Sequence, residues 1–151
     1  MGGIQRIEGK FEYRFLTWTD FDRAIAEFVK RLPARIAQER ASWFCVGEPR
    51  GGLPLAVALS HRLKIPMQPS ELMRPQGILW IDDIIDTGLT LRRARRLLSR
   101  TEFFGMVWIT KQPAEDDILS LEKVNPAMRV VFPWEDSLYS AFEGTCRKEG
   151  K

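Results

Sequence analysis

Three carboxylates, two hydroxyls and a glycine lie close together in the segment Ile81-Asp82-Asp83-Ile84-Ile85-Asp86-Thr87-Gly88-Leu89-Thr90. The adjacent carboxylates of Asp82 and Asp83 can accept hydrogen bonds from the two vicinal hydroxyls of a ribose, or hold Mg²⁺ directly or through water. In the turn that follows, Gly88 permits a positive φ, so backbone N–H groups, both hydroxyls and a helix start can point at one phosphate. The spacing predicts a ribose 5-phosphate site. The alternative is that the aspartates only cap a helix.

Two other segments carry groups that suit a phosphorylated substrate. In Gly47-Glu48-Pro49-Arg50-Gly51-Gly52, the paired glycines let backbone N–H groups approach an anion, and Arg50 adds a fork of donors. The alternative is a plain glycine-rich turn. Thr110 and Lys111 follow an apolar run, so Lys111 is either a cation of the site or a solvated lysine at a strand end.

The elements that must position these groups alternate between strands and helices. Apolar runs predict four strands, and apolar residues at helical spacing predict three helices, one before the first strand, one after it and one after the second. A further edge strand is expected within the first sixteen residues, and no element is predicted for residues 113–127. This order indicates an α/β domain with a mostly parallel sheet flanked by helices, in which the carboxyl ends of the strands carry the site. The predicted strands are 43–46, 78–81, 106–109 and 129–132, and the helices are 21–32, 53–63 and 90–100.

Length and composition limit the class of protein. The chain has 151 residues, 44% hydrophobic and 28% charged, which is typical of one globular domain spanning residues 1–151 and excludes a disordered chain. Two cysteines cannot build a disulfide scaffold, and Cys45 is expected to be a buried free thiol. With no membrane-spanning stretch and no secretory signal, we expect a soluble cytoplasmic protein with no membrane partner. A net charge of +3 suits an enzyme with a phosphorylated substrate.

The segment from Ile81 to Thr90 resembles the signature with which type I phosphoribosyltransferases bind 5-phosphoribosyl 1-pyrophosphate (PRPP). The Ile-Ile-Asp-Thr-Gly variant is similar to that of the hypoxanthine/xanthine-guanine enzymes, and the resemblance covers about residues 13–136. It implies the type I phosphoribosyltransferase fold with a small base-binding hood. It also implies an enzyme that transfers ribose 5-phosphate from PRPP to guanine, xanthine or hypoxanthine and releases pyrophosphate, in purine salvage.

The resemblance implies a role for each residue of the signature. Asp82 and Asp83 would hold the ribose hydroxyls and the cofactor Mg²⁺, and Asp86 would act as acid and base at purine N7. The pyrophosphate would bind at Arg50, Gly51 and Gly52, in a loop whose Pro49–Arg50 bond is the candidate for a cis peptide. The residues implied in PRPP binding are Asp82, Asp83, Asp86, Thr87, Gly88, Leu89 and Thr90.

The base would be bound by Lys111, Arg129, Val130 and Val131, with Lys111 reaching the oxygen at purine C6. Two departures from the family pattern accompany this assignment. Related purine enzymes often stack an aromatic side chain on the base where this chain has Arg129, whose guanidinium can also stack on a purine. The loop 66–77 is short for a lid over the reacting centre.

A homo-oligomer, either a dimer or a tetramer, is the expected assembly. The alternative function is a regulator of the same fold that binds PRPP and RNA without turnover. Its RNA would bind five arginines of the helix 90–100, although a solvated amphipathic face is the simpler interpretation and no nucleic-acid partner is expected. A receiver-type signalling domain fits less well, because its paired acids follow the first strand. The arginines are Arg92, Arg93, Arg95, Arg96 and Arg100.

Overall fold

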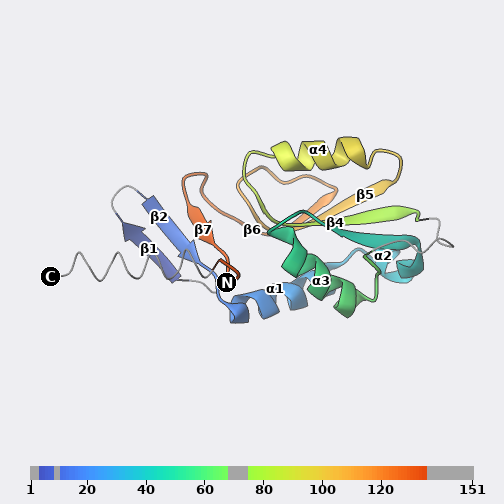
Figure 1. Cartoon of the computed structure of the whole chain (residues 1–151), viewed down its shortest axis with the longest axis horizontal. Coiled ribbons are helices and arrows are strands. Elements are labelled where there is room, and N and C mark those ends of the chain that lie inside the picture. Colours follow the sequence, from blue (N-terminus) through green and yellow to red (C-terminus); the bar gives the residue numbers. More distant parts are fainter. Residues whose placement is uncertain (1–3, 9–10, 68–74, 136–151) are drawn as a thin grey trace. The chain divides into compact units, whose positions relative to one another are not determined.

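The computed structural model describes residues 4–8, 11–67 and 75–135, with side chains from residue 11 onwards. The chain divides into two compact units, one formed by residues 1–23 together with 127–151 and the other by residues 24–126. Figure 1 labels the elements, which follow one another in the order β1 (Ile4–Glu8), β2 (Phe11–Phe15), α1 (Trp18–Arg31), α2 (Ala34–Gln38), a 3-10 turn (Arg40–Ser42), β3 (Trp43–Gly47), α3 (Gly52–Leu63), β4 (Gly77–Ile85), α4 (Leu89–Leu97), β5 (Glu102–Thr110), β6 (Ile118–Lys123) and β7 (Arg129–Val131).

A four-stranded parallel sheet in the order β3-β4-β5-β6 forms the centre of the larger unit. Figure 1 shows α4 on one side of this sheet and α3 on the other. Successive side chains of β4 alternate between the two faces, so Ile78 and Trp80 pack with Leu91 and Ala94 of α4. Because both faces are covered, the strand is a nearly continuous apolar run, as expected for a parallel sheet.

The smaller unit contains a three-stranded sheet in the order β1-β2-β7. The strands β1 and β2 form an antiparallel hairpin, and β7 runs parallel to β2 with Phe15 opposite Val131. The helix α1 starts in this unit with a reciprocal capping box. The Asp20 N–H donates to Thr17 Oγ1 at 3.2 Å, while the Thr17 N–H donates to Asp20 Oδ2 at 2.8 Å. The helix was expected over residues 21–32, and it begins three residues earlier, at Trp18.

The sheet membership of two segments differs from the sequence prediction. The strand at 129–131 was expected to join the main sheet, but it pairs with β2 in the smaller sheet, and the N-terminal strands belong there too. The fourth strand of the main sheet is β6, in a segment for which no element was predicted. Its residues are partly buried except for the exposed Lys123, and they form no long apolar run, because β6 is the last strand of the sheet among the described residues.

Element boundaries also differ. The strand β4 extends to Ile85, so Asp82 and Asp83 lie within its last four residues and not beyond its end. Asp82 lies opposite Val107 of β5, and Asp83 lies between two residues that are paired with β5. The strand continues through these polar residues because backbone hydrogen bonding does not depend on side-chain polarity. The helix α4 ends at Leu97, which leaves Arg100 beyond the helix on which it was predicted.

Cys45 is buried on β3 with a free thiol, as expected, and burial raises the pKa of that thiol to about 12. Within the described segments, none of the helices combines the length and the apolar character needed to cross a lipid bilayer. Much of the loop 66–77, considered above as a lid, lies outside the described residues, and so does Cys146.

Candidate functional site

A cavity of about 460 Å³ opens at the carboxyl end of β4, in the larger unit. Three segments form its wall: the end of β4, the turn that leads into α4, and the loop between β3 and α3. The predicted phosphate turn and the predicted pyrophosphate loop therefore share one cavity with the paired carboxylates. The lining residues are Glu48, Pro49, Gly51, Asp82, Asp83, Ile84, Ile85, Asp86, Thr87, Gly88, Leu89, Thr90, Leu91 and Arg93.

The paired carboxylates of β4 differ in exposure. Asp82 is buried, with 6% of its surface exposed, whereas Asp83 is half-buried. The backbone N–H of Asp83 donates to Asp82 Oδ1 at 2.9 Å. Burial, followed by the charge of Asp83, raises the pKa of Asp82 to about 8. A cation or a hydrogen-bond donor placed between the two carboxylates would offset both causes and favour the ionised pair.

The turn between β4 and α4 has the geometry that its sequence predicts. Gly88 has a φ of 76°, a left-handed conformation that glycine adopts without steric cost. The N–H of Leu89 approaches Thr87 Oγ1 at 3.4 Å, and the hydroxyl-bearing residues Thr87 and Thr90 are exposed. Because the first N–H groups of a helix have no partner within it, the start of α4 presents donors to the cavity.

The loop between β3 and α3 approaches β4 closely at two glycines. A Cβ on Gly51 would lie 1.9 Å from Asp83 Oδ2, and a Cβ on Gly52 would lie 2.4 Å from the Ile81 carbonyl oxygen. Only glycine fits such positions, since real Cβ atoms do not approach other heavy atoms so closely. The Pro49–Arg50 peptide bond is cis, as the family resemblance implied. Arg50 is exposed and does not line the cavity, and Gly52 lies behind Gly51 against the strand.

The Gly51→Ala substitution tests this close approach. The added methyl group must displace either the loop or the Asp83 carboxylate, so we expect PRPP to bind at least about tenfold more weakly. The melting temperature should change little, because Gly51 lies in a partly exposed loop at the cavity rim. Calorimetric titration with PRPP and a thermal melt measure the two effects, and the exposed Leu53→Ala variant is the matched control. Unchanged PRPP affinity would separate this loop from the substrate.

Glu48 and Arg93 line the cavity, although the sequence analysis assigned no role to Glu48 and counted Arg93 among solvated arginines. Trp80 Nε1–H donates to Glu48 Oε2 at 3.3 Å, and Arg93 Nη2 lies 3.5 Å from Glu48 Oε1. These contacts link the β3–α3 loop to β4 and to α4. The sequence did contain a signal for these contacts. Glu48 is a carboxylate inside a segment predicted to bind an anion, and a carboxylate in such a place needs a cationic or N–H partner.

Lys111 and Asp86 meet beside the cavity. Lys111 Nζ lies 3.4 Å from Asp86 Oδ1, and only 11% of the lysine side chain is exposed. The Lys111 N–H donates to the Ile85 carbonyl at 2.9 Å, which fixes the lysine backbone next to the end of β4. The side-chain amide of Gln112 donates to the Asp86 carbonyl. The strand order thus brings Lys111 to the acid of the signature, as the convergence of strand ends predicted.

The remaining residues predicted for the base lie in the smaller unit. Arg129 is exposed on β7, and its guanidinium carbon lies 3.7 Å from the centre of the Phe11 ring. Val130 is half-buried and Val131 is buried on the same strand. The guanidinium therefore does stack on an aromatic ring, a contact within its own sheet. That these three residues bind the base remains a prediction.

The acid pair suits a magnesium ion better than a metal that needs a full set of protein ligands. Within the described part of the chain, no group of three or more histidine, cysteine, aspartate or glutamate residues is placed to hold a metal. Mg²⁺ is commonly held by one or two carboxylates together with substrate phosphates and water. Asp82 and Asp83 fit that pattern, because they are adjacent carboxylates in the wall of the cavity that the phosphate turn and the Gly51 loop also line.

Comparisons with known proteins find the same fold. No protein-family profile and no curated protein sequence matches the chain. Among solved structures, it is similar to a purine phosphoribosyltransferase from Pyrococcus horikoshii, with 23% identity, a TM-score of 0.63, and coverage of 81% of this chain and 93% of that one. A xanthine-guanine-hypoxanthine phosphoribosyltransferase from Helicobacter pylori gives 19% identity, a TM-score of 0.63 and coverage of 87% and 97%.

A third similar structure is a hypothetical protein from Neisseria gonorrhoeae with bound ppGpp, at 17% identity and a TM-score of 0.63, with coverage of 85% of this chain and 92% of that one. At these identities the likeness concerns the fold. The chain has the type I phosphoribosyltransferase fold, with mostly parallel strands flanked by helices, as the signature implied.

Proposed function

We propose that the protein transfers ribose 5-phosphate from PRPP to guanine, xanthine or hypoxanthine and releases pyrophosphate. One observation carries the proposal: a single cavity is lined by the paired carboxylates, by the turn that ends at the start of α4, and by the loop that includes Gly51. Each segment suits one part of PRPP, namely the ribose diol, the 5-phosphate and the pyrophosphate. Fold similarity to solved purine enzymes supports the same choice.

In the proposed reaction, the bond between ribose C1′ and the pyrophosphate oxygen breaks while a bond forms between C1′ and a purine ring nitrogen. The purine loses one proton overall, and the Asp86 carboxylate would accept that proton from purine N7. Asp82 and Asp83 would hold the ribose hydroxyls and offset the positive charge that develops on the sugar. Catalysis of this kind depends on positioning and electrostatic stabilisation.

The backbone at Gly51, which lines the cavity, would bind the leaving pyrophosphate; Arg50, exposed on the same loop, would have to turn its side chain toward the bound anion, and Gly52 would serve by letting the loop lie close to β4. When bound at Asp82 and Asp83, Mg²⁺ would supply further positive charge to the phosphate oxygens. Arg93 would hold Glu48 away from the anion, since its guanidinium already lies beside that carboxylate. A negative side chain at the cavity rim is tolerable next to pyrophosphate only if it is neutralised in this way.

A pyrophosphate-release assay with PRPP, Mg²⁺ and a panel of bases tests the proposal. We expect release with guanine, xanthine or hypoxanthine, and formation of the matching nucleotide in equal amount. No release with any base, in a protein that binds PRPP, would contradict enzymatic transfer and favour the regulator.

The double substitution Thr87→Ala, Thr90→Ala tests the phosphate turn. Each hydroxyl bond to a charged phosphate contributes about 1.5–3 kcal/mol, so PRPP affinity should fall at least tenfold. The fold should persist because both side chains are exposed. Titration calorimetry measures the affinity, and Ser99→Ala, which removes an exposed hydroxyl beyond the end of α4, is the control. Equal affinities for the double variant and the unmutated protein would place the phosphate elsewhere.

The alternative, a PRPP-binding regulator that recognises RNA, rests on the arginines of α4. Arg92 and Arg96 are exposed, which leaves a positive surface. Two other arginines are engaged by carboxylates: Arg93 with Glu48, and Arg95 with Glu115 and Asp117. These internal pairs reduce the positive charge available to an RNA backbone, so we favour the enzyme.

A further inference from the structure

Arg93 of α4 has the position of a ligand for the substrate. Of the residues that line the cavity in the described part of the chain, Arg93 alone carries a positive charge. It follows Thr90 by three residues, so the two side chains lie on the same face of the helix. A cation that faces a cavity suited to a phosphorylated substrate can do more than neutralise a neighbouring carboxylate.

The guanidinium of Arg93 has donors to spare. Its Nη2 lies 3.5 Å from Glu48 Oε1, and 70% of the arginine side chain is exposed. Among the described residues, Arg93 makes no other ion pair or hydrogen bond with a side chain. A guanidinium carries its N–H donors in a planar fork, and the contact with Glu48 engages one of the two terminal nitrogens. The rest of the fork is free to meet a ligand.

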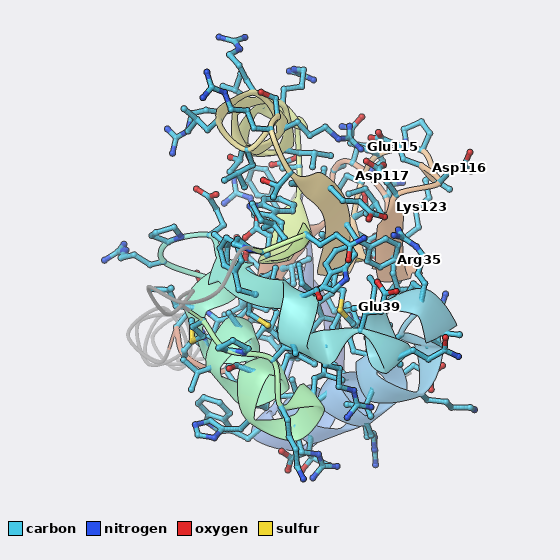
Figure 2. All side chains as sticks on the ribbon, turned by 90° about the vertical axis from the view of Figure 1, so that its right-hand side faces the viewer. Arg35, Glu39, Glu115, Asp116, Asp117 and Lys123 are labelled. Atoms are coloured by element: carbon cyan, nitrogen blue, oxygen red, sulfur yellow. The ribbon has the colours of Figure 1, made fainter. Side chains whose placement is uncertain are left out.

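Arg95, two residues later on the same helix, shows the opposite case. Both of its terminal nitrogens are engaged by Glu115 and Asp117, the carboxylates that Figure 2 labels on the segment leading into β6. Only 31% of its side chain is exposed. The guanidinium of Arg95 therefore attaches α4 to the neighbouring segment and has little left for a ligand, whereas that of Arg93 keeps Nη1 and Nε available.

The contacts of Glu48 place the Arg93 guanidinium at the loop between β3 and α3. The Glu48 N–H donates to the Ile81 carbonyl at 2.8 Å, and the Glu48 carbonyl accepts from the Gly52 N–H at 2.9 Å. The Trp80 indole N–H donates to Glu48 Oε2 at 3.3 Å, which leaves Oε1 for the arginine. The backbone and the side chain of Glu48 are thus both held, and the guanidinium beside it lies at the wall that this loop contributes to the cavity.

We propose that Arg93 binds the pyrophosphate group of PRPP directly and bridges that anion to Glu48, while Glu48 and Trp80 are positioning residues that hold the guanidinium in place. This inference rests on the proposed function, because it takes the loop beside Glu48 to receive the pyrophosphate. The 5-phosphate is assigned to the turn at the start of α4, about one helical turn before Arg93, so one helix contacts both ends of the substrate. Arginine suits such a bridge because its fork can donate to a carboxylate and to phosphate oxygens at once.

Calorimetric titration of the full chain with inorganic pyrophosphate, in the presence of Mg²⁺, tests this inference. Arg93→Gln should weaken pyrophosphate binding at least about tenfold, the effect of losing a charged hydrogen bond. Its affinity for ribose 5-phosphate should stay unchanged, because that phosphate meets the turn and not Arg93. Arg96→Gln, which removes the same charge from an exposed position of α4, is the matched control and should bind both ligands as the unmutated protein does.

A double-mutant cycle with Glu48→Gln separates a ligand from a cation that only neutralises. If Arg93 only neutralised Glu48, its replacement would have no effect once that carboxylate had been removed. We expect the double variant Glu48→Gln, Arg93→Gln to bind pyrophosphate at least about tenfold more weakly than Glu48→Gln alone. Thermal melts verify that the variants are folded. Both single changes should be tolerated, because Arg93 is exposed and the amide oxygen at position 48 can still accept from Trp80.

Equal pyrophosphate affinity of Arg93→Gln and the unmutated protein would overturn the inference, and so would equal affinities of Glu48→Gln with and without Arg93. It would also be overturned by an equal loss of ribose 5-phosphate binding, or by an unmutated protein that binds no pyrophosphate. The assay with a panel of bases tests the proposed function separately. A protein that binds pyrophosphate through Arg93 but forms no nucleotide contradicts the transfer reaction and leaves this inference standing. Nucleotide formation together with unchanged pyrophosphate binding by Arg93→Gln contradicts this inference alone.

Discussion

The Asp86→Asn variant is expected to bind PRPP with nearly unchanged affinity and to turn over at least about 10²-fold more slowly. General acid–base catalysis by a positioned side chain typically contributes 10²–10⁴-fold, and an amide cannot accept the purine proton. Asp86 suits this role because it lines the cavity with 63% of its side chain exposed, beside Lys111. Single-turnover kinetics together with PRPP titration separate the loss in rate from any loss in binding.

Asp22→Asn, which neutralises an exposed carboxylate of α1, is the matched control and should leave both quantities unchanged. If Asp86→Asn weakens PRPP binding as much as it slows turnover, Asp86 is a structural part of the turn and not a proton acceptor. A lowered melting temperature would also support a structural role, because the amide loses the ion pair that Asp86 forms with Lys111 whether or not substrate is bound.

The chemistry of the site was more predictable than its walls. The segment from Asp82 to Thr90 is contiguous in sequence, so its groups must lie close together in space in any α/β fold. The close approach of Gly51 to Asp83 joins residues that are 32 positions apart, and two glycines in a loop indicate only that something comes near. The contact between Glu48 and Arg93 was missed because exposed arginines at helical spacing have the pattern of a solvated face.

Strand pairing was less predictable than strand existence. The segment 129–132 was identified as a strand from its apolar residues, yet nothing in that short run indicates whether it pairs with β2 or with β5. The edge strand β6 was missed for a related reason. Its polar residues Ser120, Glu122 and Lys123 interrupt the apolar pattern, as is common for a strand that, among the described residues, is paired on one side only. Partner choice depends on the packing of residues far apart in sequence, which local patterns do not record.

The pairing of Lys111 with Asp86 bears on the choice of base. In a 6-oxopurine, N7 and the C6 oxygen lie next to each other on one edge of the ring system. Asp86 can accept a proton at N7 while the neighbouring Lys111 ammonium donates to the oxygen, and their charged atoms are 3.4 Å apart. Adenine presents an amino group in place of the oxygen, so the donors of a largely buried lysine would face another donor.

Guanine, xanthine or hypoxanthine should therefore be used and adenine refused, because a site built around one hydrogen-bond pattern strongly rejects the mismatched analogue. Lys111→Met should remove most of this discrimination and lower kcat/KM for the 6-oxopurines by roughly 10²-fold, the value of a charged hydrogen bond. Steady-state assays with each base measure both effects. Lys111→Arg should recover part of the preference, and Lys30→Met, at the exposed end of α1, should leave it unaltered. Efficient use of adenine or orotate by the unmutated protein would contradict the assignment of the base. It would not contradict the PRPP site, since Lys111 does not line the cavity that the phosphate turn and the acid pair form.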